Sequence, residues 1–193
     1  EIFVYGDSGF SRDNLSIKRQ ALEVSKSIAN NHKLDDENTF FLQQNSEAIE
    51  MGSFHNDIVS LSNENIFIAH EKAFQDRNKL TKLLKNLEAK IDNFQFIEIS
   101  DSEIPLKNII DSYLLNSQLA TNGQNEMMLI LPEEVKSYET CMAWLDKLKQ
   151  ISDIKLYDFV NIRQSMMNGG GPACLRLKVV LDENEIKELN QNF

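Results

Sequence analysis

A cysteine that directly follows a glycine-rich loop is the residue of this sequence best suited to chemistry. Residues 168–177 read NGGGPACLRL, so Cys174 lies between three glycines and the apolar run 175–181, which is typical of a buried strand. Glycines carry no Cβ, so such a loop can adopt positive φ and approach a ligand closely. A thiol held there could act as a positioned nucleophile. The alternative is a small buried hydrophobic residue at the start of a strand.

A histidine and a carboxylate two residues apart form the second candidate group. Residues 52–57 read GSFHND, and we expect His55 and Asp57 to alternate along an extended segment and to share one face. The imidazole can transfer protons near neutral pH, and the carboxylate can hold a guanidinium through paired hydrogen bonds. The alternative is a histidine at a loop edge, followed by an aspartate that caps a turn. With Cys174, the pair indicates cysteine chemistry on a cationic carbon–nitrogen substrate.

The other reactive side chains have ordinary interpretations. Cys141 lies within a predicted helix over residues 133–150, where a core position is expected, and Arg19 lies on the polar face of an earlier helix. His32 and His70 fall in a polar loop and at the end of a hairpin, and the histidines and cysteines lack the spacing of a zinc site. The glycine run precedes a strand instead of opening a helix, so it does not predict a nucleotide site.

Composition narrows the class of protein further. The chain has 193 residues, of which 41% are hydrophobic and 26% charged, so it can bury a sizeable core. Its formal net charge of −10 argues against nucleic acid and anionic membranes as partners, and no apolar run is long enough for a membrane span. Two cysteines are too few for a disulfide framework, so we expect reduced thiols and a cytoplasmic location.

The elements that must position these residues follow a repeated pattern. A strand–strand–helix–strand order occurs twice, first at residues 57–62, 65–70, 77–90 and 94–99, then at residues 113–120, 126–131, 133–150 and 154–159. A strand, a helix over residues 15–30 and another strand come before these two units. The first helix should bury one apolar stripe, composed of Ile17, Ala21, Val24 and Ile28.

Longer segments around the candidate residues resemble the N-succinylarginine dihydrolases, which belong to the guanidino-group-modifying enzymes. Residues 163–181 resemble the nucleophile segment of that family, and residues 54–57 (FHND) resemble its catalytic histidine motif. Residues 113–119 (YLLNSQL) and 127–132 (MMLILP) occur in the same order and at similar spacing. The resemblance extends over essentially all of the chain.

The resemblance implies a fold, a reaction and a set of roles. The fold would be α/β, a partial α/β propeller of the pentein type built of ββαβ modules. Cys174 would be the nucleophile, His55 the general acid and base, and Asp57 the carboxylate that binds the guanidinium. Arg19 and Asn168 match positions that contact the substrate, N2-succinylarginine. The products would be N2-succinylornithine, ammonia and carbon dioxide, formed without a metal or cofactor by an enzyme that is a homodimer at full length.

The same comparison suggests that the chain is one continuous part of a longer propeller. Residues 1–52 would be the tail of an upstream module, 53–104 and 105–162 two complete modules, and 163–193 the nucleophile loop with the start of the next module. Family members are more than twice as long, and their catalytic glutamate would precede Glu1, so we expect the chain alone to be inactive. Two alternatives stay open: an arginine deiminase-like enzyme that stops at the ureido product, and a non-catalytic binding or assembly module. A papain-like protease fits less well, because the order of cysteine and histidine is reversed.

Overall fold

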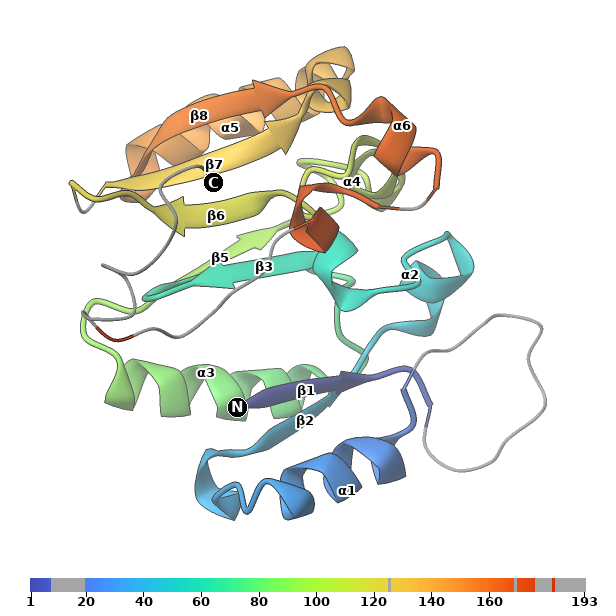
Figure 1. The fold of residues 1–193 in the computed structure, drawn as a ribbon, viewed down its shortest axis with the longest axis vertical. Coiled ribbons are helices and arrows are strands. Elements are labelled where there is room, and N and C mark those ends of the chain that lie inside the picture. Colours follow the sequence, from blue (N-terminus) through green and yellow to red (C-terminus); the bar gives the residue numbers. More distant parts are fainter. Residues whose placement is uncertain (8–19, 125, 169, 176–181, 183–193) are drawn as a thin grey trace.

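Three small sheets contain the strands of this chain in the computed structural model, which describes residues 1–7, 20–124, 126–168, 170–175 and 182 (Figure 1). The strands are β1 (Ile2–Tyr5), β2 (Phe40–Gln43), β3 (Ser60–Asn63), β4 (Ile66–His70), β5 (Gln95–Ile99), β6 (Gln118–Thr121), β7 (Met127–Pro132) and β8 (Ile154–Val160). The α-helices are α1 (Leu22–Asn31), α2 (Ser46–Glu50), α3 (Arg77–Lys90), α4 (Leu106–Ser112), α5 (Glu139–Ile151) and α6 (Arg163–Met166). The α/β class predicted from the sequence is therefore confirmed.

Two of the sheets have the same topology. In one, β3 pairs antiparallel with β4, and β4 pairs parallel with β5 across the helix α3. In the other, β6, β7 and β8 repeat this arrangement around α5. The remaining sheet has two strands, β1 and β2, which pair in parallel and are joined through α1. Each sheet is open, and the described residues form no closed ring of sheets.

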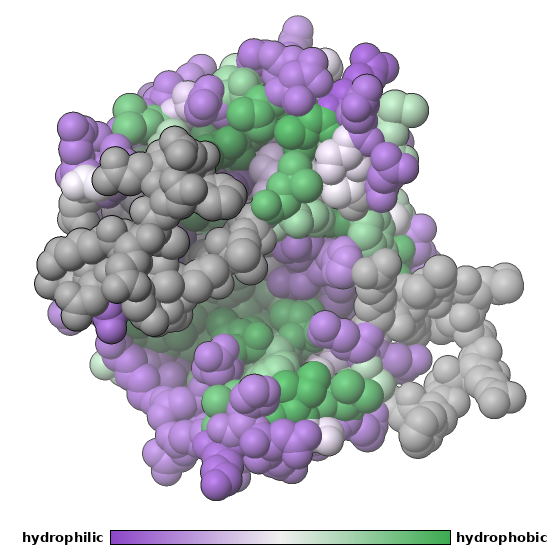
Figure 2. All heavy atoms as spheres, viewed as in Figure 1, coloured by the Kyte–Doolittle hydropathy of each residue, from purple (hydrophilic) through white to green (hydrophobic). Residues whose placement is uncertain are grey.

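The two three-stranded sheets meet along β3 and β6, which lie side by side in Figure 1. Side chains join them directly: Asn63 Nδ2 donates to Thr121 Oγ1 at 3.0 Å, and the Thr121 hydroxyl donates to Glu64 Oε1 at 2.6 Å. These bonds join the end of β3 and the residue after it to the end of β6. On the face shown in Figure 2, polar residues lie around the rim and apolar residues lie nearer the middle.

The strand β4 is buried along its whole length because it separates two hydrophobic clusters. Ile66 and Ile68 point into a cluster shared with β6–β8 and α5, whereas Phe67 and Ala69 point into a cluster shared with β2 and α3. This alternation follows from the two-residue period of a strand. The helix expected at residues 77–90 is present as α3, and its Leu80 and Leu83 are buried in the second cluster.

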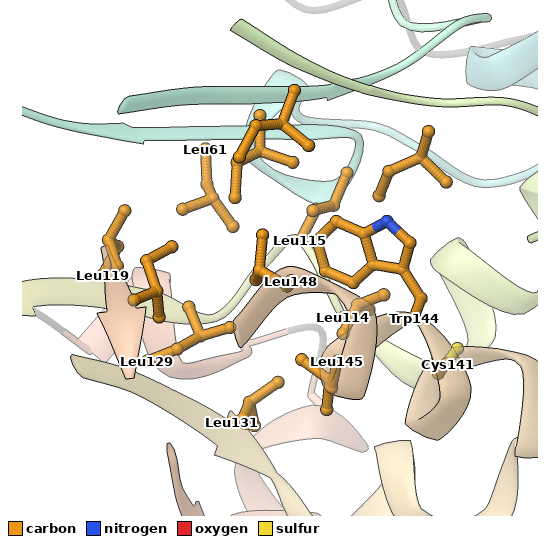
Figure 3. Close-up of a cluster of buried hydrophobic side chains, with 14 of the residues drawn as sticks. Leu61, Leu114, Leu115, Leu119, Leu129, Leu131, Cys141, Trp144, Leu145 and Leu148 are labelled. Carbon is orange, nitrogen blue, oxygen red and sulfur yellow. The ribbon is translucent and has the colours of Figure 1, made fainter. Parts of the chain in front are cut away.

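Cys141 belongs to the first of these clusters, as expected. The thiol lies on α5 at the edge of a cluster that also holds the Trp144 indole and the leucines labelled in Figure 3. Cys141 is fully buried, and burial raises the pKa of its thiol although a hydrogen bond with Ser112 acts in the opposite direction. A protonated and inaccessible thiol should react slowly with alkylating agents, which makes Cys141 an internal control for the site chemistry.

The predicted stripe of the first helix is wrong. The helix begins at Leu22, and it buries the small residues Ser25 and Ala29, whereas Val24 and Ile28 remain 53% and 43% exposed. Small side chains let the helix approach the β1–β2 sheet closely. The size of the side chains, and not their hydrophobicity, therefore determines which face of α1 is buried. Ile17 lies outside the described residues.

Other expected boundaries also moved. Residues 113–117 are not a strand, because α4 precedes them and Tyr113 ends that helix with a left-handed φ of 57°. Residues 133–137 form a 3-10 turn, so α5 starts only at Glu139. The strand expected at residues 175–181 falls outside the described residues, apart from Leu175. Within the described part of the chain, no helix is both long enough and apolar enough to cross a membrane.

The imidazole of His70 is buried at the end of β4, with 1% of the residue exposed. Its Nε2 lies 3.1 Å from the Ile104 carbonyl oxygen, and its Nδ1 accepts a hydrogen bond from the Lys72 main-chain N–H at 3.1 Å. This pair of partners fits a neutral ring protonated on Nε2. Burial lowers the pKa of His70, although the hydrogen bond with the Ile104 carbonyl oxygen and then the carboxylates of Asp101 and Glu71 partly oppose that shift.

We therefore expect the free energy of unfolding to fall when the solution is acidified below about pH 6.5, the ordinary pKa of histidine. Between that value and the lowered pKa, the unfolded chain binds a proton that the folded chain does not, so stability rises with pH in this window. Urea denaturation at several pH values measures the effect. His70→Gln should flatten the dependence, whereas His32→Gln, at an exposed position, should leave it unchanged. Equal pH dependence in all three proteins would contradict this role of His70.

Candidate active site

The candidate histidine and aspartate lie on a tight turn that leads into β3. Residues Asn56–Ile58 form a 3-10 helix, in which the Ile58 N–H bonds to the His55 carbonyl oxygen at 3.2 Å. The expectation that His55 and Asp57 alternate along an extended segment is therefore wrong, because strand pairing starts only at Ser60. The local reason is the Asn-Asp pair, which favours a turn over a strand.

Two buried polar residues hold the backbone of this turn. The Ser53 hydroxyl donates to the His55 carbonyl oxygen at 3.0 Å, and Gln44 Nε2 donates to both the carbonyl oxygen and the hydroxyl of Ser53, at 2.8 and 2.9 Å. The Phe54 ring lies beside the His55 imidazole, with 5.0 Å between ring centroids. The backbone of His55 is therefore fixed, through Ser53 and Gln44, to the end of β2.

His55 and Asp57 nevertheless reach the same cavity, which has a volume of about 510 Å³. The described residues that line it are Ile2, Val4, Gln20, Gln44, Phe54, His55, Asn56 and Asp57. A smaller cavity of about 190 Å³ shares Ile2, Val4, Asn56 and Asp57 with it. Within the described part of the chain, the buried Asp57 Oδ1 accepts no hydrogen bond. An unpaired buried carboxylate oxygen is costly, so this position favours a cation as its partner.

Cys174 lies on a second 3-10 turn, Pro172–Leu175, and is exposed. Among the described residues it does not line the cavity of His55 and Asp57. Asn116 connects the two regions: Cys174 Sγ lies 3.6 Å from Asn116 Oδ1, and Asn116 Nδ2 lies 3.4 Å from the Asp57 carbonyl oxygen. The pKa of the nearby Tyr113 is raised by burial first, then by electrostatic interaction with Cys174 and Asp57. The structure thus brings the three candidate residues into one region through Asn116.

The described part of the glycine loop is needed for space. Gly171 does not have a positive φ, so it does not use the backbone freedom that the sequence offers, and Gly169 lies outside the described residues. A Cβ on Gly171 would lie 2.0 Å from Asn116 Oδ1 and 2.6 Å from Tyr113 Cδ1. A Cβ on Gly170 would meet only the end of the flexible Ser165 side chain closely, at 2.8 Å from its Oγ. Gly171 therefore lets the loop pack onto the buried Asn116 amide.

This difference predicts unequal effects of two alanine substitutions. Gly171→Ala should push the loop away from Asn116 and break the hydrogen bond from the Ala173 N–H to the Asn116 carbonyl oxygen, which is 2.9 Å long. Overpacking of this kind costs about 1–3 kcal/mol, so amide exchange at residues 173–175 should accelerate about tenfold or more. Gly170→Ala should stay close to wild type, since a serine side chain can rotate away. Hydrogen-exchange mass spectrometry makes the comparison, and equal exchange in both variants would contradict it.

The other two candidate residues are not joined to the site by a described contact. Arg19 lies outside the described residues. Asn168 is exposed, and its Nδ2 donates to the Gln164 carbonyl oxygen at 2.9 Å, so it closes the end of α6. Within the described residues, no group of three or more histidine, cysteine or acidic side chains could hold a metal ion.

Three contributors to the site were missed from the sequence: Gln44, Ser53 and Asn116. All three are polar and buried. For Asn116 a signal existed, because it interrupts an apolar run that includes Leu114, Leu115 and Leu119. Such an interruption indicates a buried polar group with specific partners, but the sequence does not name those partners.

Solved structures that share the fold belong to an arginine dihydrolase. One is the apo structure of ArgZ, an arginine dihydrolase from the ornithine–ammonia cycle in cyanobacteria, with a TM-score of 0.51 and 14% identity over 84% of this chain and 21% of that chain. Another is the substrate-bound N-terminal domain of a mutant of the same protein, with a TM-score of 0.53 and 14% identity over 91% of this chain and 50% of that chain. At this identity the likeness defines the class of fold and leaves the chemistry open.

The family is defined by the sequence itself. The model of the succinylarginine dihydrolase family matches residues 1–193, and the chain belongs to that family. Relatives named N-succinylarginine dihydrolase include those of Shewanella loihica, with 38% identity, and Idiomarina loihiensis, with 37% identity. Both matches cover 100% of this chain and 44% of the relative, so the chain spans less than half the length of these proteins.

Proposed function

We propose that the chain supplies the cysteine, histidine and aspartate of a site that hydrolyses the guanidino group of N2-succinylarginine. The observation that carries this proposal is the Asp57 carboxylate: Asp57 lines the cavity that His55 also lines, and its buried Oδ1 has no partner in the described residues. A guanidinium is planar and positively charged, and it can donate two parallel hydrogen bonds to a carboxylate. Membership of the succinylarginine dihydrolase family supports the choice of substrate.

In the first half of the reaction, the Cys174 thiolate attacks the guanidinium carbon while Asp57 holds the guanidinium nitrogens. A carbon–sulfur bond forms, and one carbon–nitrogen bond breaks after the departing nitrogen receives a proton from the His55 imidazolium, which releases ammonia. The product of this step is a thiouronium adduct on Cys174. The neutral imidazole then removes a proton from water, the hydroxide attacks the adduct, and the thiolate leaves as the ureido compound forms.

The second half repeats this chemistry on the ureido group. Cys174 adds to its carbon, a second ammonia leaves with a proton from His55, and water hydrolyses the remaining adduct to a carbamate that loses carbon dioxide. In total, one guanidinium and two water molecules give one ammonium group on succinylornithine, two ammonia molecules and one carbon dioxide. Besides the substrate and water, the proposed steps use the Cys174 sulfur, the His55 imidazole and the Asp57 carboxylate.

The rest of the proposal concerns the longer protein. The ββαβ modules would form part of a closed α/β propeller, and Arg19 and Asn168 would contact the substrate at the ends of their segments. Because the chain spans 44% of its relatives, we propose that further residues of such a protein complete the site, and that the chain alone is inactive. The complete protein would be a cytoplasmic homodimer.

Ammonia release from N2-succinylarginine tests the proposal. The chain is assayed alone and mixed with the part of the Shewanella loihica relative that it does not match. We expect ammonia only from the mixture, with N2-succinylornithine as the final product by mass spectrometry. Accumulation of the ureido product would instead indicate a deiminase-like enzyme. A folded mixture that releases no ammonia would refute the catalytic proposal and favour a binding or assembly module.

A further inference from the structure

Asn116 is a fully buried amide between α4 and β6, flanked by buried leucines on one side. Burying an amide without hydrogen bonds costs several kcal/mol, so its contacts should be specific. Three contacts are present. Its carbonyl oxygen accepts from the Ala173 N–H at 2.9 Å, its Nδ2 donates to the Asp57 carbonyl oxygen at 3.4 Å, and its Oδ1 lies 3.6 Å from Cys174 Sγ. One residue therefore contacts both segments of the candidate site.

The orientation of the amide follows from these partners. The Asp57 carbonyl oxygen can only accept a hydrogen bond, so the Nδ2 end of Asn116 must face it. The Oδ1 end then faces Cys174, where an oxygen can accept a hydrogen bond from a thiol but cannot donate one to a thiolate. Gly171 leaves the space that this orientation requires, since a Cβ there would overlap Asn116 Oδ1.

We propose that Asn116 is a positioning residue that fixes the Cys174 sulfur relative to the Asp57 turn and holds it as a thiol until a cationic substrate arrives. This inference rests on the proposed function for its meaning, but its test does not depend on turnover. The Asn116 oxygen stabilises the S–H form, and a guanidinium beside Asp57 offsets that preference when it binds. Ionisation of the nucleophile is thereby coupled to occupancy of the site, which protects an exposed thiol from unselective reaction.

The pH profile of Cys174 alkylation by iodoacetamide distinguishes positioning from a merely structural role. Asn116→Asp keeps the shape of the side chain but places a negative charge beside the sulfur, so its profile should move to higher pH by about one unit or more. Asn116→Ala removes the oxygen that accepts from the thiol, so its profile should move to lower pH than that of the wild type. Peptide mass spectrometry reads Cys174 and Cys141 separately, and continued protection of the buried Cys141 shows that a variant is folded. Unchanged profiles in folded variants would overturn the inference.

A second measurement uses the wild-type chain and needs no variant to fold. The side-chain amide resonances of Asn116 should shift when Cys174 ionises, with the same pH midpoint as alkylation. Resonances that do not respond would overturn the inference. The outcome is separable from that of the proposed function: responsive resonances without ammonia release from the mixture would retain Asn116 as a positioning residue and remove the dihydrolase proposal. Ammonia release that requires Cys174, with unresponsive resonances, would do the reverse.

Discussion

Replacement of Cys174 by serine should abolish ammonia release from N2-succinylarginine by the chain mixed with the unmatched part of the Shewanella loihica relative. The serine hydroxyl has nearly the size of the thiol, but it does not ionise near neutral pH, so no adduct forms on the guanidinium carbon. Removing a covalent nucleophile from an otherwise intact site typically costs more than three orders of magnitude in kcat. We expect a loss of at least about 1000-fold, measured by coupled ammonia detection.

Cys141→Ser is the matched control for that substitution. It makes the same chemical change at the other cysteine, which is buried in the hydrophobic cluster with Trp144. The control should lose some stability but keep the rate of ammonia release per folded molecule. If Cys174→Ser retained a tenth or more of the activity, Cys174 would not be the nucleophile.

Asp57→Asn should separate activity from stability. The substitution keeps the shape of the side chain but removes the charge that holds the guanidinium, so kcat/KM should fall about 100-fold or more. The free energy of unfolding should stay the same or increase, because a buried carboxylate oxygen without a partner in the described residues destabilises the folded chain. Steady-state kinetics and urea denaturation measure the two effects.

A loss of stability in Asp57→Asn would point to the alternative role, that of a carboxylate that only caps the turn before β3. Asp153→Asn provides the comparison, because this aspartate is exposed in the short connection between α5 and β8. It should change neither quantity. Reduced kcat/KM in both variants would show that the loss follows from general charge and not from the site.

Regular elements were predictable because their patterns depend on nearby residues. The strand expected at residues 65–70 became β4, and the helix expected at residues 77–90 became α3, whose Leu80 and Leu83 are buried. The predicted apolar stripe of α1 was wrong because the helix buries its small residues, Ser25 and Ala29, and not the larger apolar residues that recur with the helical period. The turn at Asn56–Ile58 replaced an expected strand because an Asn-Asp pair favours local turn bonds over strand pairing.

The candidate site was predictable in its members but not in its connections. Cys174, His55 and Asp57 could be named from residue type and local context, together with the family resemblance. Asn116 contacts Cys174, 58 positions away, and Asp57, 59 positions away. The contact with Asp57 depends on how β3 and β6 meet. The need for Gly171 likewise arises from a buried amide far away in the sequence, so only the folded chain explains it.

The measurement that tests the central claim most directly compares alkylation of Cys174 by chloroacetamidine and by chloroacetamide in the wild-type chain. The two reagents have nearly the same size, but only the amidine carries the positive charge that Asp57 is proposed to bind. The account predicts that the ratio of the amidine rate to the amide rate at Cys174 is at least about tenfold higher in the wild type than in Asp57→Asn. Cys141 should stay unlabelled in both proteins. An amidine preference that is the same in the wild type and in Asp57→Asn would contradict the claim that Cys174 and Asp57 form one guanidinium-directed site.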